Sequence, residues 1–170
     1  MERFDVRRGL VKEVSANGGL GELAREFFDN VEDTGESSFR ASHGIMTAIE
    51  SRYDNGALIV DITNVPPDFD DPDAMQAAMD ARKRWTNFLD QATGYNSKQR
   101  GDKAKEWAKK ATKAKSAIST ARHFMEKAEG LSEDVITQAN TLINEIEALL
   151  DSSDNTKAAG RAGKLNKMFD

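Results

Sequence analysis

The side chains with the clearest chemical potential are basic residues gathered around one tryptophan, Trp107, with a second basic group near the end of the chain. Ammonium and guanidinium groups spaced along a helix can contact the phosphates of a nucleic acid without reading its sequence. The residues from which we expect a partner contact are Lys98, Arg100, Lys103, Lys105, Trp107, Lys109, Lys110, Lys113, Arg161, Lys164 and Lys167.

The same lysines also fit the solvated face of a helix that neighbouring acids neutralise. Residues 98–127 carry ten bases and three acids, whereas residues 131–155 carry six acids and no base. Blocks of opposite charge attract one another within a chain. Residues 1–97 are acidic as well, and the net charge of −5 gives no global field that would attract nucleic acid. The sequence therefore favours the solvated-face interpretation.

Few other residues indicate catalysis or metal binding. The chain has two histidines, His43 and His123, no cysteine, and no serine in a nucleophile elbow. Residues 19–24 match a dinucleotide-binding glycine pattern, but no apolar strand follows to complete that unit. The aspartates of residues 68–73 lack the glycine and glutamate of an EF-hand loop and suit a helix cap instead. We expect no enzyme activity, no cofactor and no metal.

The composition limits the class of protein. The 170 residues suit one ordinary domain, or a small domain with an appendage. Charges occupy the N-terminus where a signal peptide needs an apolar run. The longest aliphatic run, residues 57–60, is too short to cross a bilayer. We expect a cytoplasmic protein without membrane contact.

Residues 1–95 predict a small α+β domain. Apolar residues alternate with charged ones near Phe4 and again from residue 39 to 43, which indicates strands. Asp54-Asn55-Gly56 predicts a tight hairpin between two further strands. Helical spacing predicts helices at about 19–30 and 72–92, with a loop over 32–38. The expected fold is a small antiparallel sheet of three or four strands with two packed helices.

Residues 96–151 predict a long antiparallel helical hairpin that resembles a coiled coil. Ala104, Trp107, Ala111 and later apolar residues recur three and four apart, and Asn96 with Gln99 resembles a capping box. A helix over 97–129 would be roughly 50 Å long and the returning helix, 132–151, roughly 30 Å. The returning helix therefore leaves the first third of the longer one uncovered. Residues 152–170 predict a basic mobile tail.

Several short motifs resemble a small, uncharacterised domain family of euryarchaea. They are Arg7-Arg8-Gly9, the stretch from Ser42-His43-Gly44, the hairpin turn at 54–56, and residues 85–100, which include Trp85-Thr86-Asn87-Phe88-Leu89 and Thr93-Gly94-Tyr95. The likeness covers about residues 1–110. It implies a small α+β domain and an archaeal source, and it brings no known activity or catalytic residues.

Together these observations favour a non-enzymatic accessory module that binds another protein, or a second copy of itself, through the helical hairpin. The alternative is a nucleic-acid- or ribosome-associated protein. That alternative would use the lysine-rich helix at 98–115 and the basic end of the chain.

Overall fold

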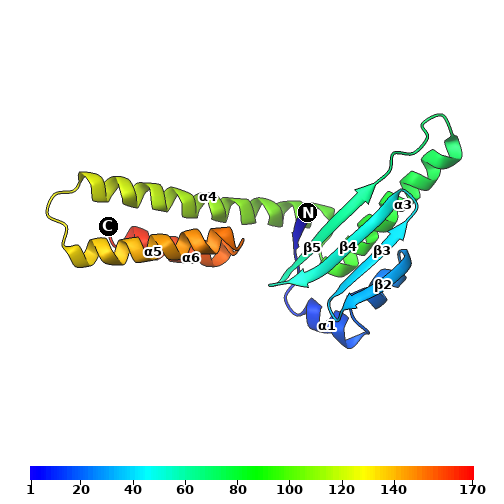
Figure 1. Cartoon of the computed structure of the whole chain (residues 1–170), viewed down its shortest axis with the longest axis horizontal. Helices are drawn as coiled ribbons and strands as arrows, with labels where there is room; N and C mark the ends of the chain where they lie inside the picture. Colours follow the sequence, from blue (N-terminus) through cyan, green and yellow to red (C-terminus); the bar gives the residue numbers. More distant parts are fainter. The chain divides into compact units, whose positions relative to one another are not determined.

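The computed structural model describes all 170 residues and divides into two units, Met1–Lys103 and Ala104–Asp170. The first unit contains five strands and three helices: β1 (Glu2–Asp5), α1 (Leu10–Ala16), α2 (Leu20–Arg25), β2 (Asp29–Gly35), β3 (Ser38–His43), β4 (Met46–Asp54), β5 (Ala57–Asn64) and α3 (Pro72–Thr93). Three further helices follow: α4 (Ser97–Lys127), α5 (Glu133–Asp151) and α6 (Asn155–Lys167) (Figure 1).

The five strands form one antiparallel sheet in the order β1-β5-β4-β3-β2. Strands β2 to β5 pair in chain order, and β1 adds to the free edge of β5. The turn between β4 and β5 holds Asn55 at φ 47° and Gly56 at φ 75°. Two successive positive φ values characterise the hairpin turn that Asn-Gly predicts.

Aromatic residues join α2 and α3 to the sheet. Phe88 of α3 is fully buried, and its ring lies 5.0 Å from that of Phe28 and 5.6 Å from that of Phe39. Tilted and edge-on ring pairs at this spacing add to the stabilisation that burial alone provides. The helix α3 runs along one face of the sheet (Figure 1), so this cluster lies between the two layers.

The first unit differs from the sequence prediction in its first half. The sheet has five strands because β2 occupies residues that we expected to form a loop. Almost every side chain of β2 is exposed, so this edge strand has no apolar alternation to reveal it. The helix expected at 19–30 ends at Arg25, because Phe27 and Phe28 enter the core from the connection that follows α2. Helix α1 was not expected.

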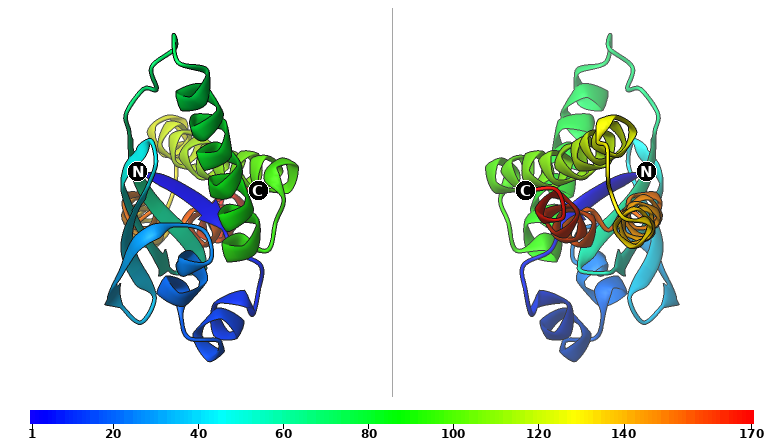
Figure 2. Two further views of the ribbon diagram at one scale, coloured as in Figure 1. Left: turned by 90° about the vertical axis from the view of Figure 1, so that its right-hand side faces the viewer. Right: turned by 90° about the vertical axis from the view of Figure 1, so that its left-hand side faces the viewer.

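The second unit has its own core, which α4, α5 and α6 share. Ala114, Ile118 and Ala121 of α4 pack with Ile143 and Ile146 of α5, and α6 adds small residues to the same cluster. The right-hand view of Figure 2 looks along the three helices, which lie side by side around this core. Ser132 caps α5 by accepting a hydrogen bond from the Val135 amide at 3.3 Å.

The end of the chain differs from the predicted mobile tail. Residues 155–167 form α6, which Asp154 caps through the Lys157 amide at 3.2 Å. Ala158, Ala162 and Leu165 are fully buried and recur at helical spacing. The prediction failed because two glycines and a cluster of bases concealed an apolar stripe made mostly of alanine. None of the six helices combines the length and apolar content of a membrane span.

Candidate nucleic-acid interface

Arg100 contributes to the turn between α3 and α4. Its side chain is 6% exposed, and its guanidinium donates hydrogen bonds to Asp90, to the carbonyl oxygen of Tyr95 and to Ser97 Oγ. This buried position leaves little of the guanidinium for an outside partner. The sequence predicted Arg100 as a partner contact, whereas the structure gives it an internal role.

The other predicted residues at the start of α4 are less buried. Asn96 and Gln99 form the expected capping box. The backbone amide of Asn96 donates to Gln99 Oε1 at 3.0 Å, and the backbone amide of Gln99 donates to Asn96 Oδ1 at 2.9 Å. Lys98 is exposed, and the Lys103 ammonium lies 5.9 Å from the centre of the Tyr95 ring. Lys105 is also exposed.

Trp107 marks the point at which α6 begins alongside α4. The side chain of Trp107 is half-buried, and the backbone carbonyl oxygen of Trp107 accepts a hydrogen bond from Asn155 Nδ2 at 3.1 Å. Asn155 is itself buried at the start of α6. The first third of α4 was expected to be left uncovered, and this is wrong at Trp107, because α6 begins beside that residue.

Helices α4 and α6 run parallel to one another. Near the start of α6, Lys110 Nζ in the middle of α4 donates to Thr156 Oγ1 at 3.2 Å. Near their end, the rings of Phe124 and Phe169 lie 4.9 Å apart. A groove of about 380 Å³ follows the two helices, with Ala117 and Ala121 in its lining and Lys113 among its charged residues. Lys113 of α4 therefore lies across this groove from Asn166, Phe169 and Asp170 at the end of the chain.

The charged residues of the second unit are sorted between its helices. Two of the five acids of α5 pair with neighbouring helices: Glu147 with Arg122 of α4 at 2.7 Å, and Glu145 with Arg161 of α6 at 3.2 Å. Lys157 pairs with Asp154. By contrast, six exposed lysines of α4 and α6 in this unit make no ion pair: Lys109, Lys113, Lys115, Lys127, Lys164 and Lys167. Lys115 lines the depression between α4 and α5, and Lys127 ends α4. We call Lys109, Lys113, Lys164 and Lys167 the basic face.

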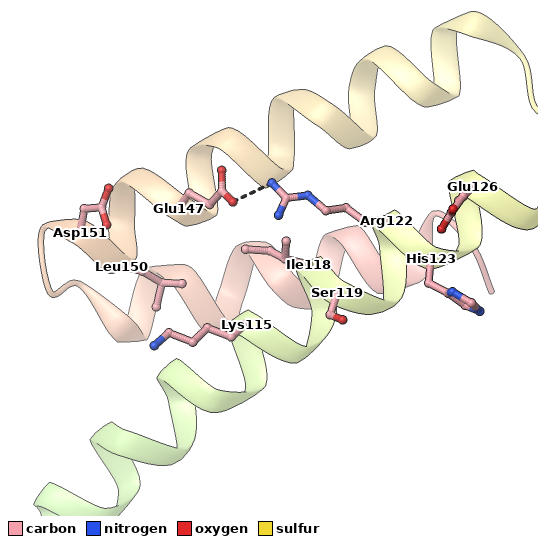
Figure 3. A pocket seen from close by; sticks show the side chains of 9 residues that line it. All are labelled: Lys115, Ile118, Ser119, Arg122, His123, Glu126, Glu147, Leu150 and Asp151. Carbon is pink, nitrogen blue, oxygen red and sulfur yellow. Dashed lines mark hydrogen bonds and ion pairs between the residues drawn. The ribbon is translucent and has the colours of Figure 1, made fainter.

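A second depression, of about 610 Å³, lies between α4 and α5 (Figure 3). Its lining contains two bases, Lys115 and Arg122, and three acids, Glu126, Glu147 and Asp151, together with His123. The Arg122–Glu147 ion pair spans it, and the ring of His123 points away from that pair in Figure 3. A lining of mixed charge offers no clear site for an anion or a cation.

The remaining motifs have structural roles. Asp71 caps α3, with its carboxylate accepting from the Asp73 amide at 2.9 Å, and Pro72 occupies the first turn as predicted. Gly19 precedes the six-residue helix α2, and a side chain at this position would lie 2.9 Å from the Glu36 carbonyl oxygen. His43 Nδ1 lies 2.9 Å from an oxygen of Asp29. The structure contains no cluster of three or more histidine and acidic side chains that could hold a metal ion.

Sequence reasoning missed one exposed apolar cluster. Val65, Phe69 and Met79 are large apolar residues that the structure leaves at the surface around the connection between β5 and α3. The sequence signal was weak, since Val65-Pro66-Pro67 reads only as the end of a strand.

The chain thus consists of an α+β domain followed by a three-helix unit. Residues 1–106 match the family described as a domain of unknown function (DUF5611), and the chain belongs to this family. The suspected membership in an uncharacterised family is confirmed, and the archaeal source stays a prediction. No curated protein matches the chain, and no solved structure does. The basic face lies beyond the matched residues.

Proposed function

We propose that the protein is a non-enzymatic nucleic-acid-binding module that contacts the phosphate backbone through the basic face. The observation that carries the proposal is the sorting of charge within the second unit. Glu147 and Glu145 of α5 engage Arg122 and Arg161, while Lys109, Lys113, Lys164 and Lys167 have no acidic partner. Lysines held on helices without counter-ions release condensed cations when they meet phosphates, which favours binding.

This charge distribution changes the balance between the two interpretations of the lysines. The sequence favoured neutralisation by the acidic helix, but the carboxylates of α5 that form ion pairs meet arginines rather than lysines. The second unit as a whole carries 11 bases and 10 acids, so its net charge is close to zero. Segregation of the charges, rather than their sum, supports the proposal.

Protein binding or self-association through the seam of α4 has less support. That function requires apolar side chains of α4 to be open to a partner. The seam residues Ala114, Ile118 and Ala121 are buried against α5 and α6. A partner that used them would have to displace part of this core.

The test is a titration of the full chain with a labelled DNA duplex or RNA of about 20 base pairs, followed by fluorescence anisotropy at several salt concentrations. Each lysine–phosphate contact contributes about −0.9 to the slope of log K against log salt on duplex DNA. The triple variant Lys109→Ala, Lys113→Ala, Lys167→Ala should therefore flatten the slope by about 2.7.

A matched control removes the same charge elsewhere. Lys12→Ala, Lys83→Ala and Lys115→Ala together lower the net charge by the same amount as the first triple variant. Lys115 lines the depression between α4 and α5 rather than belonging to the basic face. The slope of this control should stay within about one contact of the unaltered chain. Absence of binding at low salt, or equal losses in both triple variants, would refute the proposal.

A further inference from the structure

Three large apolar residues are exposed at and after the β5–α3 connection. The exposed fraction is 74% for Phe69, 58% for Met79 and 50% for Val65. Phe69 and Val65 also line a pocket of about 380 Å³, whose inner wall includes Ile45 and Trp85. We call Val65, Phe69, Met79 and this pocket the apolar surface. Large apolar side chains exposed beside a pocket are typical of an interaction site.

The connection that carries Phe69 is built from conformationally restricted residues. Pro66 and Pro67 fix the backbone after β5, and Asp68 accepts a hydrogen bond from the Asp70 amide at 3.0 Å. Asp71 then caps α3. A phenyl ring on such a segment is held in place rather than free to withdraw, so it costs a partner little conformational entropy to meet it.

Acidic side chains flank Phe69 along the β5–α3 connection, whereas Arg82 lines the pocket on its α3 side. The sequence from Tyr53 to Ala81 contains seven aspartates and neither lysine nor arginine. Three of these acids, Asp68, Asp70 and Asp73, are exposed within a few residues of Phe69. Acids around an apolar patch favour a partner that carries basic residues beside its apolar side chains.

The helix α3 extends the apolar surface in one direction. Met75, Met79 and Arg82 follow one another at spacings of four and three residues, which places them along one side of α3. Arg82 lines the pocket, so this row starts at the pocket edge. Methionine side chains adapt readily to different apolar partners and are common on surfaces that bind helices.

We propose that the apolar surface docks an amphipathic helix of a partner protein. One bulky apolar side chain of that helix enters the pocket beside Phe69, its apolar stripe covers Met75 and Met79, and flanking lysines or arginines face Asp68 and Asp70. This mode is helix-in-groove recognition, in which a few central apolar anchors provide most of the affinity. The site lies in the residues that define the family and is independent of the basic face.

The test uses two synthetic helical peptides of about 18 residues, or five turns, as probes. Both carry the same leucine stripe; the polar face is lysine in one and glutamate in the other. Each is titrated into the full chain labelled with ¹³C at its methionine methyl groups. The lysine peptide should shift the signals of Met46, Met75 and Met79 and leave Met125 and Met168 of the second unit unchanged.

Single substitutions distinguish binding of the lysine peptide at the apolar surface from non-specific attraction to an acidic protein. Phe69→Ser should weaken binding of the lysine peptide at least about tenfold. Phe124→Ser is the matched control, since Phe124 is also an exposed phenylalanine but belongs to the second unit. It should change the affinity less than about twofold. The glutamate peptide should bind at least about tenfold more weakly than the lysine peptide.

Each contrary result overturns the proposal. Shifts at Met125 or Met168 in place of the three expected signals would locate binding elsewhere. Equal affinity of both peptides would show that the acids play no part in recognition. An unchanged affinity after Phe69→Ser would show that the apolar surface is not the binding site. Self-association of the chain in light scattering that Phe69→Ser abolishes would assign the surface to a second copy. The free-state methionine spectrum of each variant checks that the fold is intact.

Discussion

Leu165→Ala should destabilise the second unit by about 2–3 kcal/mol. The side chain of Leu165 is fully buried in the core that α4, α5 and α6 share. Truncation of a buried leucine removes its transfer free energy and leaves a cavity, with costs between about 2 and 5 kcal/mol. The lower part of that range applies because Leu165 lies near the end of the chain, where α6 can settle into the space.

Urea unfolding of the full chain, followed through the methionine methyl signals, measures this change unit by unit. Met125 and Met168 report on the second unit, and Met46 on the first. With a slope near 1 kcal/mol per molar urea, the midpoint of the second unit should fall by roughly 2–3 M. Lys164→Ala, at the neighbouring exposed position, should change stability by less than about 0.5 kcal/mol. An unaltered midpoint for Leu165→Ala would show that residues 155–167 are not packed, as the sequence first indicated.

Three further substitutions address other parts of the chain. Gly160→Ala should stabilise the second unit by about 0.5–1 kcal/mol in the same urea experiment, because a Cβ there meets no atom within 4 Å. Arg100→Met should lower the midpoint of the first unit yet leave nucleic-acid affinity within about twofold, since the buried guanidinium binds Asp90. Burial raises the pKa of Tyr53 above its ordinary 10.0, so the folded state keeps the proton and the stability of the first unit should fall as the pH rises above 10. Tyr53→Phe should cost about 1 kcal/mol near neutral pH, where the hydroxyl donates to the Ala92 carbonyl at 2.7 Å, and this cost should shrink at about pH 11.

The features that the sequence predicted well depend on contacts between residues close in the chain. The hairpin turn at 54–56, the cap at Asp71 and the Asn96–Gln99 box each involve residues at most three apart. Their hydrogen-bonding chemistry is specified by residue type and spacing alone. The starts of α3 and α4 could therefore be located to within a residue.

The features that escaped prediction depend on contacts across the sheet or between helices. Strand β2 forms because β3 supplies hydrogen-bond partners, and its own polar residues do not reveal it. Helix α6 forms against a core that it joins mainly through alanines, and an alanine-rich stripe beside lysines and glycines is hard to recognise as apolar from composition alone. The candidate site differs from the predicted one for the same reason. Helix α6 packs against α4, so Lys164 and Lys167 belong to an ordered helix beside the lysines of α4 rather than to a mobile tail.

The acidic balance of the chain is compatible with a basic nucleic-acid-binding face. At physiological ionic strength, charges separated by more than about 8 Å are largely screened from one another, whereas a lysine in contact with a phosphate is not. The repulsion expected from a net charge of −5 is therefore a long-range term that salt removes. Salt also weakens the direct contacts, through counterion release, but with a slope that depends only on the lysines that touch phosphate. The slope measured with the triple lysine variant is for this reason a sharper test of the basic face than the affinity at any one salt concentration.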